Sequence, residues 1–354
     1  MGAQPTRRVG LDSNPDLTPN VSAYRLIYLQ FAAYGLLQGA NDGFQSAYIK
    51  VCSIMRHTAH VIRIAGMGIA LLLLTQVSGR ATEMQYLADQ TGRQIRVPVK
   101  PQRVVALAPS ITEIIYALEC QDRLKGATRF SDYPEAAQRI PKVGSYVYLD
   151  LEKIVALNPD VCIAIKDGNP KSVIDRLRAL DIPVFAVNPR DLDTVMQAIG
   201  HIGKLMGAEE RATQIIADMA ARIAEVESKV AQTERRPRVF FQIGISPIVS
   251  AGSDTFIHEL IVKAGGVNIA GEYTSYPRFS KEEVLELAPD VLIITSMARK
   301  EVFDRVKSEW EQWEQIPAVA NNRVHLVDSN LFDRPTPRLV DALEKLVKLI
   351  HPEM

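Results

Sequence analysis

Residues 103–118 read RVVALAPSITEIIYAL, a short apolar run followed by Pro109-Ser110 and then by a second apolar pattern. The first run has the length of a strand. In the second, Ile111, Ile114, Ile115 and Leu118 fall at the spacing of one helix face. Serine is a favoured residue at the start of a helix. The stretch therefore predicts a strand that leads into a helix capped by Ser110.

The same alternation continues on the C-terminal side. The sequence predicts strands at 124–130, 160–165 and 182–188, separated by helices at 151–157 and 172–180. Strands that alternate with helices form a parallel sheet covered on both faces. Residues 82–205 are therefore expected to form an N-terminal α/β lobe.

A long helix follows, and then the α/β pattern begins again. One apolar stripe runs between Gly207 and the stop at Arg235-Arg236-Pro237, and it consists of Ala212, Ile215, Ile216, Met219, Ile223, Val226 and Val230. Further strands are predicted at 238–244, 290–295 and 322–328, with helices at 254–264, 281–287 and about 337–350. The predicted fold class is α/β, with two Rossmann-like lobes that hold parallel sheets, joined by one long helix. Its boundaries are 206–236 for the linking helix and 237–354 for the C-terminal lobe.

The N-terminal part has the pattern of a targeting segment. Residues 64–74 read IAGMGIALLLL, after Arg56 and Arg63 and before the small-residue stretch TQVSGRA. These features predict a signal peptide over 55–81, cut after Gly79 or Ala81, and secretion to the periplasm. A membrane-spanning helix would need about twenty apolar residues, so permanent anchorage by this segment is the weaker alternative. Met55 is a suitable start for such a leader, so residues 1–54 are expected to be an extension that carries no readable function.

Composition and motifs exclude several function classes. Lys plus Arg and Asp plus Glu both number 41, so no bulk charge attracts nucleic acid. The sequence contains no G-x-S-x-G elbow and no P-loop, and His258-Glu259 lacks the second histidine of a metalloprotease helix. The histidines are not spaced as a metal cluster. The protein is therefore not expected to be an enzyme or to hold a metal.

An internal repeat marks two glutamates. Residues 151–161, LEKIVALNPDV, correspond to residues 281–291, KEEVLELAPDV, and in both copies a Glu lies seven residues before Pro-Asp-Val. Glu152 and Glu282 thus occupy the first turn of a predicted helix in each lobe. A negative charge there is favoured by the helix dipole. The dipole accounts for each Glu alone but not for its recurrence in both lobes.

The chain from Arg103 onward resembles the periplasmic cobalamin-binding proteins of ABC importers, within the wider group that also carries ferric siderophores and haem. The matching segments are RVVALAPSITEIIYAL, FSDYPEAAQRIPKVGSY, LDLEKIVALNPDVCIA, the Gly-Asn of KDGNP, RVFFQIGISP, FSKEEVLELAPDVLIIT and FDRPTPR. The resemblance implies a class III periplasmic binding protein, with a rigid helix at about 208–233 and a ligand cleft between the lobes. It also implies docking of Glu152 and Glu282 onto an ABC permease and ATPase complex. The protein is expected to be a monomer.

The resemblance further implies a set of cleft residues. Cobalamin binders of the family cover the corrin ring with aromatic side chains, and the corresponding positions here are Phe130, Tyr146, Ile165, Val249 and Tyr276. On the other wall, polar and ligand-contacting positions correspond to Asn330, Phe332 and Arg334. No resident cofactor is implied, because the corrinoid is the transported ligand. Haem or a hydrophobic ferric chelate would also suit such walls, and a two-lobed metal-cofactor enzyme or chelatase is a third alternative.

Some residues are expected to be structural. Arg338 follows Pro337 at a helix start, and Trp310 and Trp313 lie three apart in one predicted helix, which favours core packing over ligand contact. Cys120 and Cys162 could lie close enough to pair, and their pairing is left open.

Overall fold

The computed structural model describes Lys50, Ser53, residues 83–295 and residues 300–354. The chain divides into two units, Met1–Ala81 and Thr82–Met354, and the fold described below is that of the second unit. The predicted signal peptide at 55–81 and, apart from Lys50 and Ser53, the extension at 1–54 lie outside the described residues. No helix in the described part of the chain is both long enough and apolar enough to cross a membrane.

The second unit begins with a hairpin that the sequence patterns did not predict. Strands β1 (Met84–Ala88) and β2 (Gln94–Pro98) pair antiparallel. The turn between them attaches to the N-terminal lobe, since Gln90 N donates to Ala186 O at 3.1 Å. The Asp89 carboxylate accepts from Ala186 N at 3.2 Å. Leu87, Ile95 and Val97 extend the hydrophobic core beneath this hairpin.

The N-terminal lobe holds a four-stranded parallel sheet in the order β4-β3-β5-β6. Its elements in chain order are β3 (Val104–Ala106), α3 (Pro109–Ala117), η1 (Gln121–Arg123), β4 (Leu124–Ala127), η2 (Glu135–Arg139), α4 (Leu151–Ala156), β5 (Val161–Ile165), α5 (Lys171–Ala179) and β6 (Val184–Val187). Strand β3, the first of this sheet in chain order, lies inside the sheet, with β4 on one side of it and β5 on the other. Such a change of winding direction opens a crevice at the carboxyl ends of the strands.

Two local predictions for this lobe were wrong. The residue at the start of α3 is Ala108 and not Ser110, because Pro109 takes the first helical position, where its fixed φ suits the helix. The strand expected at 124–130 ends at Ala127, because Thr128 turns aside to hydrogen-bond Ser131 through the two hydroxyls at 3.0 Å.

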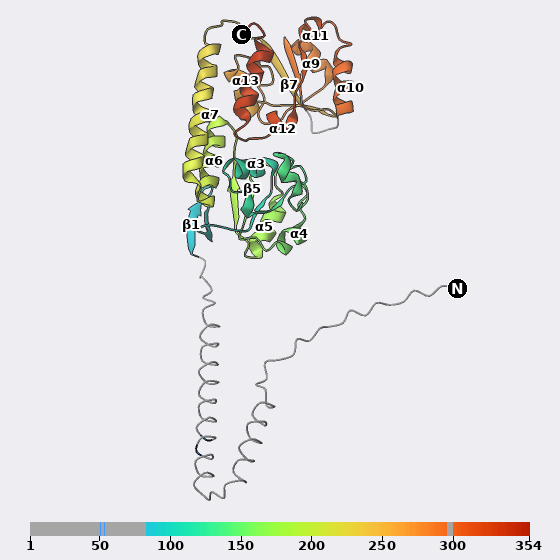
Figure 1. The fold of residues 1–354 in the computed structure, drawn as a ribbon. Helices are drawn as coiled ribbons and strands as arrows, with labels where there is room; N and C mark the ends of the chain where they lie inside the picture. Colours follow the sequence, from blue (N-terminus) through green and yellow to red (C-terminus); the bar gives the residue numbers. More distant parts are fainter. Residues whose placement is uncertain (1–49, 51–52, 54–82, 296–299) are drawn as a thin grey trace, which may run out of the picture. The chain divides into compact units, whose positions relative to one another are not determined.

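The linker consists of two packed helices. The sequence patterns identified α7 (Glu209–Val230) but not α6 (Leu192–Met206), which packs along it (Figure 1). Asp191 and Thr194 form a capping box at the start of α6, and Gly207, with φ of 63°, ends that helix in the left-handed region. The predicted stripe of α7 faces the core, with Ile216 only partly buried.

The C-terminal lobe has a mixed sheet and not the purely parallel one expected. Strands β7 (Arg238–Gly244), β11 (Val291–Ile294), β12 (Val324–Leu326) and β9 (Val267–Asn268) pair in parallel. Strands β8 (Ile248–Ser250) and β10 (Arg278–Phe279) add an antiparallel edge beside β7. The helices are α8 (Phe256–Lys263), α9 (Lys281–Leu287), α10 (Lys300–Trp310), α11 (Pro317–Ala320), α12 (Ser329–Phe332) and α13 (Leu339–Ile350).

One continuous hydrophobic cluster joins the two lobes. It contains side chains from β3 and α3, from α6 and α7, and from β7, α8 and α13. The lobes are therefore built onto a shared core. The predicted fold class, two α/β lobes joined by a long helix, is confirmed.

Contrary to the sequence prediction, the two tryptophans do not share one helix. Trp310 is fully buried as expected, and its indole Nε1 donates to Gln242 Oε1 at 2.9 Å. Helix α10 ends at Trp310, so Trp313 lies beyond it, partly buried against the second core cluster of this lobe.

Candidate ligand-binding site

A cavity of about 670 Å³ lies at the carboxyl ends of the parallel strands, between the two lobes. The N-terminal lobe contributes residues at or shortly after the ends of β3, β4, β5 and β6, together with Tyr146 from the segment between η2 and α4. The C-terminal lobe contributes residues from β7 and β8, from the start of α8 and from three loops. The lining residues are Ala108, Pro109, Ser110, Phe130, Tyr146, Ile165, Asp167, Pro189, Arg190, Ile243, Val249, Asp254, Thr255, Phe256, Ile257, Ser275, Tyr276, Asp333, Arg334 and Pro335. This volume is in the range of small-molecule sites.

On the N-terminal wall, Tyr146 is held by the Gly168-Asn169 pair. The Asn169 amide donates to Tyr146 O at 2.9 Å and to Leu107 O at 2.8 Å, and its oxygen accepts from Ile165 N at 2.8 Å. A Cβ at position 168 would lie 3.4 Å from the Tyr146 ring and 3.2 Å from Ile165 Cγ2. Glycine therefore lets the ring pack closely over the end of β5, so the aromatic wall is preorganised.

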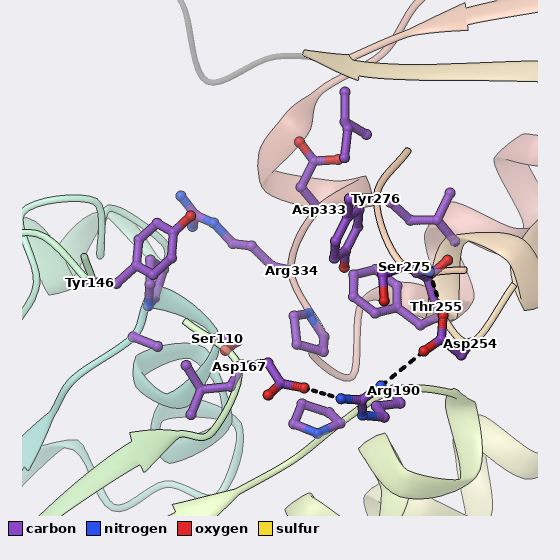
Figure 2. A pocket seen from close by; sticks show the side chains of 18 of the residues that line it. Ser110, Tyr146, Asp167, Arg190, Asp254, Thr255, Ser275, Tyr276, Asp333 and Arg334 are labelled. Atoms are coloured by element: carbon purple, nitrogen blue, oxygen red, sulfur yellow. Dashed lines mark hydrogen bonds and ion pairs between the residues drawn. The ribbon is translucent and has the colours of Figure 1, made fainter. Parts of the chain in front are cut away.

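On the C-terminal wall, Tyr276 follows a strained turn. Asp254 and Ser275 have φ of 61° and 58°, and Ser275 N donates to the Asp254 carboxylate at 2.6 Å. Left-handed backbone at residues other than glycine is costly and occurs often at functional sites. The turn presents Tyr276, which is 51% exposed, along the cavity wall opposite Tyr146 (Figure 2). Partial burial and nearby carboxylates raise the pKa of the Tyr276 hydroxyl, so the side chain is a neutral phenol.

Arg190 bridges the two lobes at one side of the cavity. It follows β6 of the N-terminal lobe and forms ion pairs with Asp167 of the same lobe and, at 3.1 Å, with Asp254 of the other lobe (Figure 2). All three side chains are partly exposed, so solvent screens these pairs. The guanidinium of Arg190 is therefore shared by the carboxylates of Asp167 and Asp254.

A second cross-lobe cluster is buried. Glu113 of α3 is 4% exposed, and its two carboxylate oxygens accept from Arg334 and from Arg338 of the C-terminal lobe, each at 2.8 Å. Arg334 also contacts Asp132 at 2.9 Å and donates to Phe130 O at 2.9 Å. Burial raises the pKa of Glu113, and the arginines oppose that change. Arg334 therefore reaches the cavity with its charge already compensated.

Six of the eight residues expected at the cleft line the cavity: Phe130, Tyr146, Ile165, Val249, Tyr276 and Arg334. Asn330 and Phe332 do not. Phe332 is fully buried in the core beside Phe241, with 6.0 Å between ring centroids, because α12 turns that side chain inward. The Asn330 side chain accepts from Arg334, and its carbonyl accepts from Arg338 at 2.9 Å, so it supports the two arginines.

The polar lining residues Asp167, Arg190, Asp254, Ser275 and Asp333 were not identified from the sequence. Asp167 and Arg190 shortly follow predicted strands. Ligands of parallel sheets bind at the carboxyl ends of the strands, so this position could have identified both residues as candidates. Asp254 was expected at the start of a helix over 254–264, but that helix begins at Phe256, so Asp254 lies in the loop before it. Ser275 lies in a loop for which the sequence pattern gave no indication.

The repeated glutamates lie away from this cavity. Glu152 and Glu282 are both exposed in the first turns of α4 and α9, which Asp150 and Ser280 cap with their side chains. Neither glutamate forms an ion pair with another described residue. The neighbouring lysines are engaged elsewhere, Lys153 with Asp150 and Lys281 with Glu309.

No group of three or more His, Cys, Asp and Glu residues within 83–295 and 300–354 is arranged to hold a metal ion. Cys120 and Cys162 are both buried and both free. Burial raises the pKa of the Cys162 thiol to about 12.

Two α/β lobes on a long helix, with a cavity at the carboxyl ends of their strands, define a class III periplasmic binding protein. The chain belongs to the periplasmic binding protein family, whose model matches residues 104–331. The family relationship places it among substrate-binding proteins.

Curated relatives and solved structures extend this assignment. The chain is 29% identical over 246 residues to the vitamin B12-binding protein of Yersinia pestis (strain Pestoides F), which covers 69% of this chain and 85% of that protein. Its fold is similar to that of the vitamin B12-binding protein BtuF of Vibrio cholerae, with a TM-score of 0.63, 28% identity and coverage of 72% and 98%. It is also similar to the apo form of the periplasmic heme-binding protein RhuT from Roseiflexus sp. RS-1, with a TM-score of 0.65, 26% identity and coverage of 71% and 98%.

Proposed function

We propose that this protein is a non-enzymatic periplasmic substrate-binding protein that captures a corrinoid, such as cobalamin, and delivers it to an ABC importer. A corrinoid is a flat macrocycle with apolar faces and with amide groups around its edge. The aromatic and aliphatic side chains on both walls of the cavity suit the faces. The carboxylates along the lining suit amide N–H donors.

The observation that favours a corrinoid is that both arginines lining the cavity are already paired with carboxylates of the protein. Arg190 is shared by two carboxylates, and Arg334 is bound to Glu113 and Asp132. A ligand with carboxylates of its own would have to displace these acids or stay unpaired, which is costly in a partly buried site. An amide-rich ligand without net negative charge meets no such penalty.

Haem is the second candidate, and a specific feature supports it. A tyrosine can ligate ferric haem, and Tyr146 and Tyr276 both line the cavity. However, ligation requires a phenolate, and the raised pKa of Tyr276 disfavours that form. The propionates of haem, like the anionic groups of a ferric siderophore, would also lack a free cation among the lining residues.

Delivery requires a partner, and we assign docking on the permease to Glu152 and Glu282. Two exposed carboxylates at equivalent positions of the two lobes suit a two-point contact with cationic groups on a two-fold symmetric permease. Neither carboxylate lines the cavity, so docking and ligand binding should be separable.

An uptake assay tests this proposal. Proteoliposomes that contain the importer's permease and ATPase are supplied with labelled cyanocobalamin and with wild type, Glu152→Lys, Glu282→Lys or the double variant. We expect uptake to fall sharply in each single variant and further in the double, since like charges then face the permease. Ligand affinity should not change. Glu286→Lys, on the same helix as Glu282, is the matched control.

Normal uptake by the double variant would rule out the docking role. Loss of ligand binding in either single variant would show that these residues act on the ligand site. If the wild type supports no cyanocobalamin uptake and binds none, the corrinoid assignment itself is wrong.

A further inference from the structure

Arg190 connects the two walls of the cavity (Figure 2). It follows β6 of the N-terminal lobe, and its Nη1 donates to Asp254 Oδ2 of the C-terminal lobe at 3.1 Å. Its Nη2 pairs with Asp167, which shortly follows β5 of its own lobe. One guanidinium therefore joins a carboxylate of each lobe.

Asp254 uses its other oxygen within its own lobe. Asp254 Oδ1 accepts from Ser275 N at 2.6 Å. Both residues have left-handed backbone, with φ of 61° and 58°, which costs free energy at residues other than glycine and persists only where the surroundings hold it. Tyr276 is the next residue in the chain. The contacts therefore run from Arg190 through Asp254 to the turn that carries Tyr276.

Backbone hydrogen bonds hold this turn against the loop that contains Asp254. Gly252 N donates to Ser275 O at 2.8 Å, and Ser275 N donates to Ser253 O at 3.2 Å. Both bonds lie within the C-terminal lobe. The ion pair with Arg190 extends the same network to the opposite wall of the cavity.

The Tyr276 ring depends on this turn for its position. Its side chain is 51% exposed, so packing against neighbours holds only part of it. Partial burial is the main reason that the pKa of the Tyr276 hydroxyl is raised, and the charges of Asp167 and Asp254 add to the effect. The ion-paired group and the ring therefore lie within electrostatic reach of each other.

We propose that Arg190 is a positioning residue, which pairs with Asp254 across the cavity and thereby fixes the turn that places the Tyr276 ring against the bound corrinoid. This inference rests on the proposed function. A side chain of one lobe then sets the aromatic wall of the other, so the complete cavity requires both lobes in their native arrangement. The three charged side chains are partly exposed, so salt weakens the effect.

Arg190 itself lines the cavity, so positioning must be separated from direct contact with the ligand. Cyanocobalamin carries a phosphate in its nucleotide loop, whereas cobinamide lacks the nucleotide and this phosphate. A guanidinium that contacts the phosphate matters for cyanocobalamin alone. A guanidinium that positions Tyr276 matters equally for both ligands, because they share the corrin ring.

The binding test is titration of both ligands into wild type, Arg190→Gln, Asp254→Asn and the double variant. Asparagine at 254 keeps an oxygen that accepts from Ser275 N but removes the charge that holds Arg190. We expect both single variants and the double to bind both ligands about three- to fivefold more weakly, the range of a partly exposed ion pair. In a Tyr276→Ala background, Arg190→Gln should cause no further loss.

Arg176→Gln is the matched control, because Arg176 is an exposed arginine of the same lobe, on α5, and does not line the cavity. It should bind both ligands as the wild type does.

A measurement without ligand tests the positioning itself. The protein is labelled with fluorotyrosine, and the fluorine NMR signal of Tyr276 is assigned by its loss in Tyr276→Phe. We expect this signal to shift and narrow in Arg190→Gln, and in the wild type at high salt, as the ring gains mobility. In Arg176→Gln it should match the wild type.

A loss of affinity for cyanocobalamin but not for cobinamide would show direct contact and overturn the inference. A further loss from Arg190→Gln in the Tyr276→Ala background, or an unchanged Tyr276 signal in Arg190→Gln, would also overturn it. If the wild type binds neither corrinoid, the proposed function fails, whereas the fluorine signal still decides whether Arg190 positions Tyr276.

Discussion

Tyr276 shows how single residues prepare the cavity. The strained turn at Ser275, fixed by the Asp254 carboxylate, determines where the ring lies before any ligand arrives. Asp254 in turn pairs with Arg190 across the cleft. The position of one aromatic side chain is therefore linked to the approach of the two lobes.

Removing this ring should weaken corrinoid binding. Tyr276→Ala is expected to cost about 1 to 3 kcal/mol of binding free energy, because a ring that stacks on the macrocycle loses its contact area. Calorimetric titration with cyanocobalamin measures the change. Tyr148→Ala is the control, since Tyr148 is 79% exposed and does not line the cavity. Equal affinity in both variants would mean that Tyr276 is an ordinary loop residue.

The cleft residues were carried over from the family resemblance, and whether they line the cavity depends on the local backbone. Phe130 shortly follows β4 and Ile165 ends β5, where the carboxyl ends of parallel strands meet at one edge of a sheet, and Tyr146 lies in the segment between η2 and α4. Phe332 lies in a short helix, where a rotation of the backbone by one residue moves a side chain from the cavity to the core. Asp333, the next residue, lines the cavity in its place.

At the scale of elements, α6 and α7 form the rigid part of the linker. They approach closely at Gly203, where an added Cβ would lie 2.5 Å from Ala212 Cβ and 3.3 Å from Ala208 O. Close approach of two helices at a glycine leaves little freedom for one to slide on the other. The hydrophobic stripe of α7 was readable from its period. The pairing with α6 was not, because a period shows that a face is buried but not what covers it.

Substitution at Gly203 tests this packing. Gly203→Ala should destabilise the protein by about 1 to 3 kcal/mol, because α6 must move away from α7. Gly200→Ala, on the same helix, would place its Cβ 3.6 Å from Ile216 Cδ1, an ordinary contact. That control should be neutral or about 0.5 to 1 kcal/mol more stable, as alanine favours helix. Urea unfolding measures both, and equal stabilities of the two variants would contradict the close packing of α6 on α7.

The remaining elements show the same limit of sequence patterns. The βαβ alternation predicted strands β3 to β7, β11 and β12, together with most of the helices, because each of these strands lies in an apolar run that alternates with a helical pattern. The two-residue and three-residue strands β8, β9 and β10 lie in no such run. They are held by pairing with β7 and with one another, which sequence spacing does not reveal.

At the scale of the whole Thr82–Met354 unit, the lobes are joined in three ways. They share one hydrophobic cluster, the buried Glu113 group links them behind the cavity, and the exposed Arg190 group links them at its side. The first two are costly to separate, whereas the third is screened by solvent. The cavity is therefore largely preformed, which reduces the ordering cost of binding a rigid macrocycle.

The central claim, that this preformed cavity binds a corrinoid, is tested most directly by calorimetric titration of the wild-type protein at pH 8 with cyanocobalamin, with cobinamide and with haemin. We expect cyanocobalamin or cobinamide to bind with a dissociation constant in the micromolar range or tighter, about −8 kcal/mol or better, and haemin to bind more weakly. A clear signal with haemin and none with either corrinoid would contradict the assignment.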